Sequence, residues 1–314
     1  MSFMLMEKLN IHSTYRLNNG SQMPVIGLGV WKAQEGKEVE QAVLWAIEAG
    51  YRLIDTAKAY GNEAGVGRAV SASKIPRSEI FITTKLFNGD QGYKSTLKAI
   101  DESLNRLKMD YIDLYLIHWP FVNWLQGENR REETWKAMEE IYKSGKAKAI
   151  GVSNYTIEHL EEMSAKGGYA QIPHAVNQVE FHPFLYQKEL MDYCQKNQIL
   201  LEAYAPLARG QKVTDSKVSA IAQKYNKTNA QVILRWNIQH GNTVIPKSVH
   251  KERILENINI FDFELSEADM KTLDNLDENF RIVNPNKYNP HLTKLYLKLK
   301  TFLSAIFVLI ILSK

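Results

Sequence analysis

Eight short runs of apolar, β-branched residues recur along this 314-residue chain and alternate with stretches of helical spacing. Near-continuous apolar strands separated by helices indicate a parallel sheet that is covered on both faces. Eight such units close a (β/α)8 barrel, and the chain has the usual length for one. The pattern therefore predicts an α/β protein with a single TIM barrel. The eight runs are residues 26–30, 52–55, 80–85, 112–118, 149–153, 175–178, 199–204 and 243–246.

Two further features complete the predicted fold. Residues 15–17 and 23–26 flank an Asn18-Asn19-Gly20 turn signal, which predicts an N-terminal β-hairpin that closes the bottom of the barrel. Helical spacing marks the segments between strands. The segments so marked are 38–49, 95–107, 133–142, 158–164, 188–195 and 217–225.

An open doubly wound sheet is the alternative fold, and its glycine signature is missing. The dinucleotide-binding version needs G-x-G-x-x-G after the first strand, but Gly27-Leu28-Gly29 lacks the third glycine. Gly65 and Gly67 lie inside a helical pattern. We therefore interpret these glycines as turn and close-packing residues. Residues 1–280 are predicted to form one barrel domain, and residues 281–314 an atypical basic and hydrophobic tail.

The charge of the chain is concentrated in that tail. The net charge is +4, but residues 281–314 hold six Lys/Arg and no Asp/Glu, which leaves −2 on the remainder. A body with this charge has no electrostatic footprint for nucleic acid. The single cysteine, Cys194, excludes an internal disulfide and indicates a reducing compartment. The N-terminus shows no secretion signal, so we expect a cytoplasmic protein.

Nearly every predicted strand ends in a polar or aromatic residue. In a barrel of this kind the chemistry lies at the carboxyl ends of the strands. Each residue alone has an ordinary structural interpretation as a cap, a surface charge or a core side chain, but their joint placement on one rim favours a functional site. The residues are Trp31, Asp55, Lys85, His118, Ser153, Asn154, Gln178, Tyr204, Lys247 and Ser248.

A phenol follows the second predicted strand and a lysine ends the third. Tyr60 has a reference pKa of about 10 and donates a proton poorly at neutral pH without help. A nearby Lys85 ammonium favours the phenolate and lowers that pKa, and Asp55 holds the ammonium in place. These residues make a general acid, and a neutral His118 imidazole would orient a carbonyl oxygen beside it.

Other kinds of catalytic centre find no support in the sequence. No cluster has metal-ligand spacing, and the lone cysteine has no partner for a zinc site. No Gly-x-Ser-x-Gly elbow is present. A site with acid–base groups and no nucleophile fits a hydride supplied by a cofactor.

Eight characteristic segments follow one another along the chain: GLGVW, DTAKAYGNE, TTKLFN, DLYLIHWP, IGVSNY, NQVEFHP, EAYAPL and IPKSVHKERILEN. This ordered series, which spans roughly residues 10–280, resembles the aldo-keto reductases, in the prokaryotic and protozoan branch of that family. The resemblance implies NADPH-dependent reduction of aldehydes, dicarbonyls and ketones, with Asp55, Tyr60, Lys85 and His118 as the catalytic tetrad.

The resemblance also implies binding residues. Ser153, Asn154 and Gln178 resemble the residues that bind the nicotinamide carboxamide, and Tyr204 the residue that stacks on its ring. Those that match the adenosine 2′-phosphate and adenine site are Lys247, Ser248, Val249, Arg253, Glu256 and Asn257. A basic loop that opens a helix independently indicates a phosphate site, although an ordinary basic helix face is the alternative.

The substrate side is predicted to be aromatic and open. Trp31, Phe87 and Trp119 would form a pocket for the apolar part of a substrate beside His118, with core packing as the alternative for Phe87. The loop at residues 121–132 is short compared with the family's first substrate loop. We therefore expect small carbonyl substrates.

A second class of function and the role of the tail remain as alternatives. Some barrels of this type are NADPH-binding sensor subunits without significant turnover, but all four tetrad positions are filled here. Residues 301–312 are uncharged, shorter than the ~18 residues that a membrane span needs. Surface attachment to a membrane, a helix packed on the barrel and a foreign reading frame are the three interpretations of this tail. We expect a monomer.

Overall fold

The computed structural model describes residues 9–120, 130–164 and 167–283, and these form an eight-stranded barrel. All neighbouring strands in the sheet are parallel. Bridges between Ile26 and Val244 and between Gly29 and Lys247 join the first strand to the last and close the sheet. The predicted fold is confirmed. In chain order the strands are β3 (Leu28–Gly29), β4 (Leu53–Asp55), β5 (Phe81–Leu86), β6 (Ile112–Ile117), β7 (Ala147–Ser153), β8 (Val176–Glu180), β9 (Leu200–Tyr204) and β10 (Thr243–Val244).

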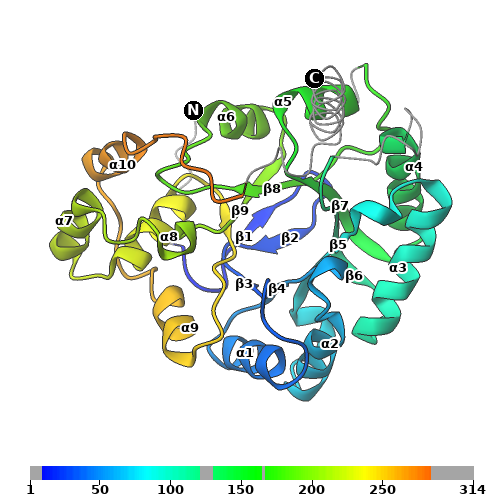
Figure 1. Cartoon of the computed structure of the whole chain (residues 1–314), viewed down its shortest axis with the longest axis horizontal. Helices are drawn as coiled ribbons and strands as arrows, with labels where there is room; N and C mark the ends of the chain where they lie inside the picture. The colour runs from blue at the N-terminus through cyan, green and yellow to red at the C-terminus, as the bar shows by residue number, and fades with distance from the viewer. Residues whose placement is uncertain (1–8, 121–129, 165–166, 284–314) are drawn as a thin grey trace, which may run out of the picture.

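Helices surround this sheet, as Figure 1 shows in a view that looks into the ring of strands. The predicted helices are present with end shifts of a few residues. Helix α2 contains the helical pattern around Gly65 and Gly67, α9 is the helix expected after the basic loop, and α8 and α10 were not predicted. The α-helices are α1 (Lys37–Glu48), α2 (Glu63–Ala72), α3 (Tyr93–Leu107), α4 (Arg130–Lys143), α5 (Ile157–Met163), α6 (Lys188–Lys196), α7 (Ser216–Tyr225), α8 (Asn229–Gln239), α9 (Lys251–Ile258) and α10 (Glu267–Asp274). Short 3₁₀ turns include η1 (Lys58–Tyr60), η2 (Arg77–Glu79), η3 (Asn88–Asp90) and η5 (Ala208–Gly210).

The predicted hairpin lies at the amino ends of the barrel strands. Strands β1 (Thr14–Arg16) and β2 (Gln22–Pro24) pair antiparallel. Leu17 and Met23 are buried in one cluster with Leu53 and Phe81, which begin β4 and β5. The hairpin therefore closes the bottom of the barrel with apolar side chains and leaves the carboxyl ends of the strands for polar ones.

The seam where the barrel closes explains two of the glycines. A Cβ on Gly27 would lie 2.0 Å from Leu53 Cδ2, and one on Gly29 would lie 2.9 Å from the Ile245 carbonyl oxygen. These glycines permit a close approach of strands, as predicted. Strands β3 and β10 are shorter than the runs at 26–30 and 243–246 that predicted them. Pro246 has no N–H to donate to a ladder, which limits the pairing at this seam.

Side chains alternate between the barrel interior and the helical layer. Leu53 belongs to the small interior cluster, whereas Ile54 belongs to the large cluster between sheet and helices. Because this alternation has a period of two, Asp55 points into the barrel two residues above Leu53. The same period places Lys85 inside, two residues beyond the buried Thr83 on β5. The upper interior of the barrel is therefore polar.

Candidate active site

A buried lysine lies at the centre of the polar group predicted from the strand ends. Lys85 Nζ donates to Asp55 Oδ1 and Oδ2, each at 2.7 Å, and to the Thr56 carbonyl oxygen at 2.9 Å. It lies 3.3 Å from Tyr60 Oη. Both members of the Asp55–Lys85 pair are buried. The structure therefore brings the carboxylate, the ammonium and the phenol together at the carboxyl ends of β4 and β5.

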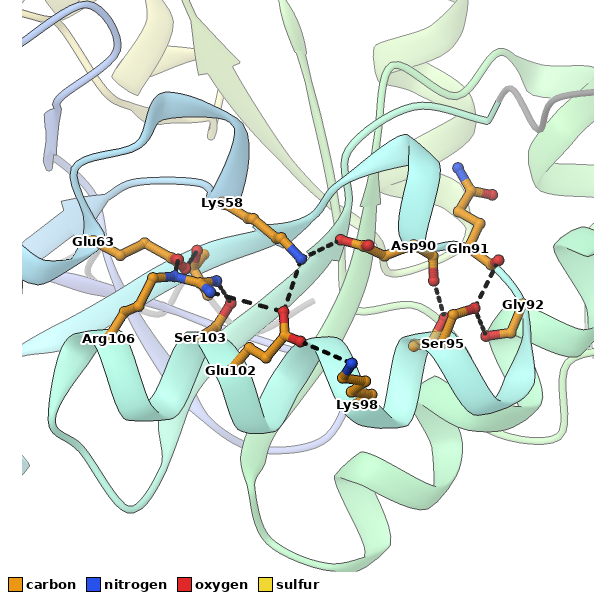
Figure 2. Close-up of polar contacts among 12 residues, drawn as sticks. Lys58, Glu63, Asp90, Gln91, Gly92, Ser95, Lys98, Glu102, Ser103 and Arg106 are labelled. Atoms are coloured by element: carbon orange, nitrogen blue, oxygen red, sulfur yellow. Dashed lines mark hydrogen bonds and ion pairs between the residues drawn. The ribbon is translucent and has the colours of Figure 1, made fainter.

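Tyr60 is presented by a short turn that ion pairs hold against its neighbours. It ends the 3₁₀ turn η1, after which Gly61 adopts the left-handed conformation at φ 71°. Lys58 of the same turn contacts Asp90 Oδ2 at 2.7 Å and Glu102 Oε2 at 3.0 Å. Figure 2 shows Lys58 between these two carboxylates, which come from η3 and α3. The turn that carries the phenol is thereby tied to η3 and α3.

A second contact holds the start of the helix that follows this turn. The buried Glu63 side chain accepts from Thr84 Oγ1 at 2.6 Å and from Arg106 Nε at 2.6 Å. Asn62 stands at the N-cap position of α2, but its side chain makes no capping hydrogen bond. It donates instead to the carbonyl oxygens of Val30 and Ala33. The polar side chains at the start of α2 therefore hydrogen-bond to neighbouring elements and hold the helix in place against them.

His118 lies on the other side of the phenol. Its ring centroid is 5.7 Å from that of Tyr60, with the two rings nearly perpendicular. Burial and the nearby Lys85 ammonium lower the pKa of His118 to about 3. The imidazole is therefore neutral at physiological pH, as the sequence analysis predicted.

The pKa of Tyr60 differs in net direction from the sequence prediction. Lys85 does lower it, but burial and the Asp55 carboxylate outweigh this effect, so the pKa lies above its ordinary value. For Lys85, burial alone would lower the pKa, and Asp55 more than offsets it. At neutral pH the site therefore presents a protonated phenol beside a charged ammonium.

Four residues predicted for the nicotinamide form one hydrogen-bonded patch. Asn154 Nδ2 donates to the His118 carbonyl oxygen at 2.9 Å and to Ser153 Oγ at 3.0 Å. Its Oδ1 accepts from Tyr204 Oη at 2.8 Å, and Ser153 Oγ donates to the Gln178 carbonyl oxygen at 2.8 Å. Asn154 has a φ of 65°, a left-handed conformation that asparagine tolerates well. The patch lies beside His118 and fixes the Tyr204 ring.

Gln178 is oriented by two buried carboxyl groups. Its Nε2 donates to Asp55 Oδ2 and to Glu202 Oε2, each at 2.8 Å. Both amide hydrogens are thereby used, so the acceptor Oε1 is the atom left for a ligand. A carboxamide N–H is a suitable donor to it.

The predicted phosphate site surrounds the start of α9. His250 takes the N-cap position without a side-chain capping bond, so the first N–H groups of the helix are open to an anion. Lys247 and Arg253 are exposed, and neither is ion-paired with another residue in the described part of the chain. Ser248 is buried and its Oγ accepts from His250 N at 3.1 Å. This arrangement fits a phosphate group.

The remaining residues predicted for this site lie around the same helix. Val249 packs against the large hydrophobic cluster, and Asn257 is buried. Glu256 accepts from Thr228 Oγ1, the N-cap residue of α8, at 2.6 Å. Its carboxylate is thus already tied to a neighbouring helix.

The predicted aromatic residues have different surroundings. Trp119 is buried and lines a cavity of about 740 Å³ together with Asn154 and Tyr204. Trp31 lies near two cations, with the Arg209 guanidinium 4.2 Å and Lys32 Nζ 4.6 Å from its ring centroid. Phe87 is 45% exposed, so the core-packing alternative for it is wrong. The described rim is therefore aromatic on several sides. Residues 121–129 of the predicted short loop lie outside the described residues.

The sequence analysis did not identify the part of the chain that borders this cavity at the end of the barrel domain. Both oxygens of the buried Glu180 carboxylate accept backbone N–H groups, from Ile282 at 2.7 Å and Val283 at 2.8 Å. Arg281 Nη2 donates to Gln187 Oε1 at 2.8 Å. Glu180 could have been suggested by its place at a strand end. The tail beyond residue 283 lies outside the described residues.

Among the described residues, no group of three or more His, Cys, Asp or Glu side chains could hold a metal ion. Within the same ranges, no helix is both long and apolar enough to cross a membrane.

The fold and this rim define a barrel with acid–base groups and an uncapped, basic helix N-terminus at its carboxyl-terminal face. The Aldo/keto reductase family model matches residues 25–278. The chain belongs to the aldo/keto reductase family, which confirms the recognition made from the sequence motifs.

Relatives from distant organisms cover nearly the whole barrel. A glyoxal reductase of Bacillus subtilis (strain 168) is 51% identical over 277 residues, 88% of this chain and 97% of the relative. A 9,11-endoperoxide prostaglandin H2 reductase of Trypanosoma cruzi (strain CL Brener) is 47% identical over 278 residues, 87% of this chain and 95% of the relative. The crystal structure of a Bombyx mori aldo-keto reductase in complex with NADP is 34% identical, with a TM-score of 0.83, over 90% of this chain and 99% of that one.

The low pKa of His118 generates a prediction about pH. Because the folded-state pKa of about 3 lies far below the ordinary value, the imidazole gains no proton between pH 5 and 8. We expect ¹⁵N NMR of the histidine side chains to show His118 neutral over this range. Protonation of His118 with a midpoint near 6.5 would contradict the account.

Proposed function

We propose that the chain reduces small aldehydes, dicarbonyls and ketones to alcohols with NADPH, and that Tyr60 is the general acid. The observation that carries the proposal is the contact of Tyr60 Oη with Lys85 Nζ, which is itself paired with Asp55. NADPH supplies a hydride when bound. The carbonyl carbon accepts the hydride, and the carbonyl oxygen takes the proton of the phenol, so that the product is a neutral alcohol.

The proposed roles of the tetrad follow from charge. A phenol that has given up its proton is an anion, and the Lys85 ammonium 3.3 Å away stabilises it. Asp55 keeps the ammonium charged and in place. The neutral His118 imidazole can hydrogen-bond to the carbonyl oxygen and orient it toward the phenol.

The proposed cofactor site extends from the barrel mouth to α9. Ser153, Asn154 and Gln178 would hold the carboxamide of the nicotinamide, and the Tyr204 ring would stack on it. At the other end, Lys247 and Arg253 with the open N-terminus of α9 would hold the 2′-phosphate, with Ser248, Val249, Glu256 and Asn257 around the adenosine. A preference for NADPH over NADH follows, because only NADPH carries that phosphate.

The proposed substrate site is the rim near His118, with Trp31, Phe87 and Trp119 as its aromatic walls. The similarity to a glyoxal reductase supports small dicarbonyls as substrates. An assay of glyoxal, methylglyoxal and simple aldehydes with NADPH tests the proposal, and turnover of none of them would refute it.

We further propose that the chain works as a cytoplasmic monomer. The lone cysteine, Cys194, is buried and free. In this proposal residues 1–280 form the catalytic domain and residues 281–314 are an appendage to it. The sensor alternative predicts NADPH binding without turnover.

Replacement of Tyr60 by phenylalanine tests the general acid. We expect Tyr60→Phe to lower kcat for aldehyde reduction by about 10²–10⁴-fold, the usual contribution of general acid–base catalysis. NADPH affinity, measured by fluorescence titration, should stay within about threefold, since the phenol is proposed to act on the substrate.

Tyr115→Phe is the matched control, because the Tyr115 hydroxyl is buried on the helix-facing side of β6 and has no partner among the described residues. It should leave kcat close to wild type. Equal losses in the two variants would contradict the proposal. An inactive parent protein that binds NADPH would favour the sensor.

Replacement of Arg253 tests the phosphate site. A charge-assisted hydrogen bond contributes about 1.5–3 kcal/mol, so Arg253→Ala should raise KM for NADPH by about 10–100-fold. KM for NADH should change by less than about threefold, because NADH lacks the phosphate. Lys271→Ala removes an exposed charge on α10 as a control. An equal effect of Arg253→Ala on the two cofactors would refute the assignment.

A further inference from the structure

A glutamate that the proposed mechanism does not use lies inside the barrel beneath the tetrad. Glu202 is on β9, and its side chain is fully buried. Its strand neighbours in register are Gln178 on β8 and Thr243 on β10, both uncharged. A carboxyl group in this position is costly unless it is paired or neutral, so its contacts determine what it does.

One amide joins Glu202 to the catalytic group. Gln178 Nε2 lies 2.8 Å from Glu202 Oε2 and 2.8 Å from Asp55 Oδ2. Asp55 in turn accepts from Lys85, which contacts Tyr60 Oη. A continuous chain of hydrogen bonds therefore runs from Glu202 to the phenol, through side chains of β8, β4 and β5.

The second oxygen of Glu202 indicates whether this carboxyl group is ionised or neutral. Oε1 is buried and has no hydrogen-bond partner among the described residues. The charged or titratable groups that act on Glu202 are Asp55 from β4, Lys85 from β5 and Tyr60 from η1. The single ammonium is already paired with Asp55, so a second carboxylate would be an unpaired buried charge.

At acidic to neutral pH, the protonated and neutral form of Glu202 therefore has the lowest free energy. Burial and the Asp55 carboxylate raise the pKa of Glu202 to about 8. Loss of its proton above that pH places a negative charge within the hydrogen-bonded chain.

We propose that Glu202 is a positioning residue beneath the tetrad. Its carboxyl group gains and loses a proton, and its charge sets the highest pH at which carbonyl reduction stays active. The inference rests on the proposed function, in which Tyr60 must be protonated to act. It also gives Glu202 a second task, because Glu202 and Asp55 together fix the amide plane of Gln178 toward the cofactor.

The direction of the effect follows from charge. A negative Glu202 raises the pKa of Tyr60 and of Lys85. Ionised Glu202 therefore keeps the phenol protonated, and the acid active, to a higher pH. A neutral residue in place of Glu202 lacks this negative charge, so Tyr60 should lose its proton at a lower pH.

The pH dependence of kcat/KM for aldehyde reduction by full-length protein tests this inference. Glu202→Gln keeps the shape and an acceptor for Gln178 but removes the charge. We expect its alkaline limb to move down by about one pH unit, the scale of a nearby-charge effect. Glu139→Gln is the matched control, since Glu139 is a buried glutamate on α4 that accepts backbone N–H groups from Gln171 and Ile172. Its limb should coincide with that of the wild type.

An unmoved or upward-shifted limb in Glu202→Gln would overturn the inference while the wild-type activity still upheld the proposed function. An inactive wild type would instead contradict the proposed function. Wild-type protein supplies a test that needs neither activity nor a variant: ¹³C NMR of labelled glutamate carboxyls should show one resonance that titrates near pH 8. Absence of such a resonance would also overturn the inference.

Discussion

The ion pair of Asp55 and Lys85 is the interaction on which the geometry of the site depends. Both side chains are buried, and together they contact the phenol, the Thr56 carbonyl oxygen and the Gln178 amide. Removal of one partner from a buried pair leaves an uncompensated charge, at a cost of about 3–5 kcal/mol. The pair is stable here because β4 and β5 hold adjacent strand ends in register and supply further hydrogen bonds.

The closed barrel makes this pair possible because its interior is apolar at the bottom and polar at the carboxyl ends of the strands. The hairpin and the lower strand residues, including Leu17, Met23 and Leu53, form an apolar floor. The residues above it are polar, so that charged groups meet at the mouth. The turn that carries Tyr60 is then fixed by ion pairs of Lys58 with Asp90 and Glu102 (Figure 2). Ion pairs therefore hold both the turn that carries the phenol and the lysine that contacts it, as a preorganised acid requires.

The strand ends could be predicted from the sequence because a parallel barrel gathers them on one rim. That rule identified Asp55, Lys85, His118 and Asn154, and the structure places them within one connected group. It also predicted the hairpin and the family. Helix α8 was not predicted, although Thr228 and Gln231 form a capping box that is visible in the sequence.

Other features depend on contacts between residues that are distant in the sequence. Glu202 lies two residues before a strand end and looks like a surface residue in an apolar strand, and only the closed sheet shows that it faces Gln178. Asn62 resembles a helix cap locally, but its side chain bonds to distant carbonyl groups. The net pKa of Tyr60 depends on burial, which sequence spacing does not reveal. These differences all come from long-range contacts within the barrel.

The central claim is that the Lys85 ammonium stabilises the phenolate formed as Tyr60 gives its proton to the carbonyl oxygen. The most direct measurement is the single-turnover rate of NADPH oxidation by an aldehyde with Lys85→Met protein whose folding is verified by circular dichroism. The account predicts a rate reduced by about 10²–10⁴-fold, with NADPH affinity within about threefold of wild type. A hydride-transfer rate close to that of the wild type would contradict it.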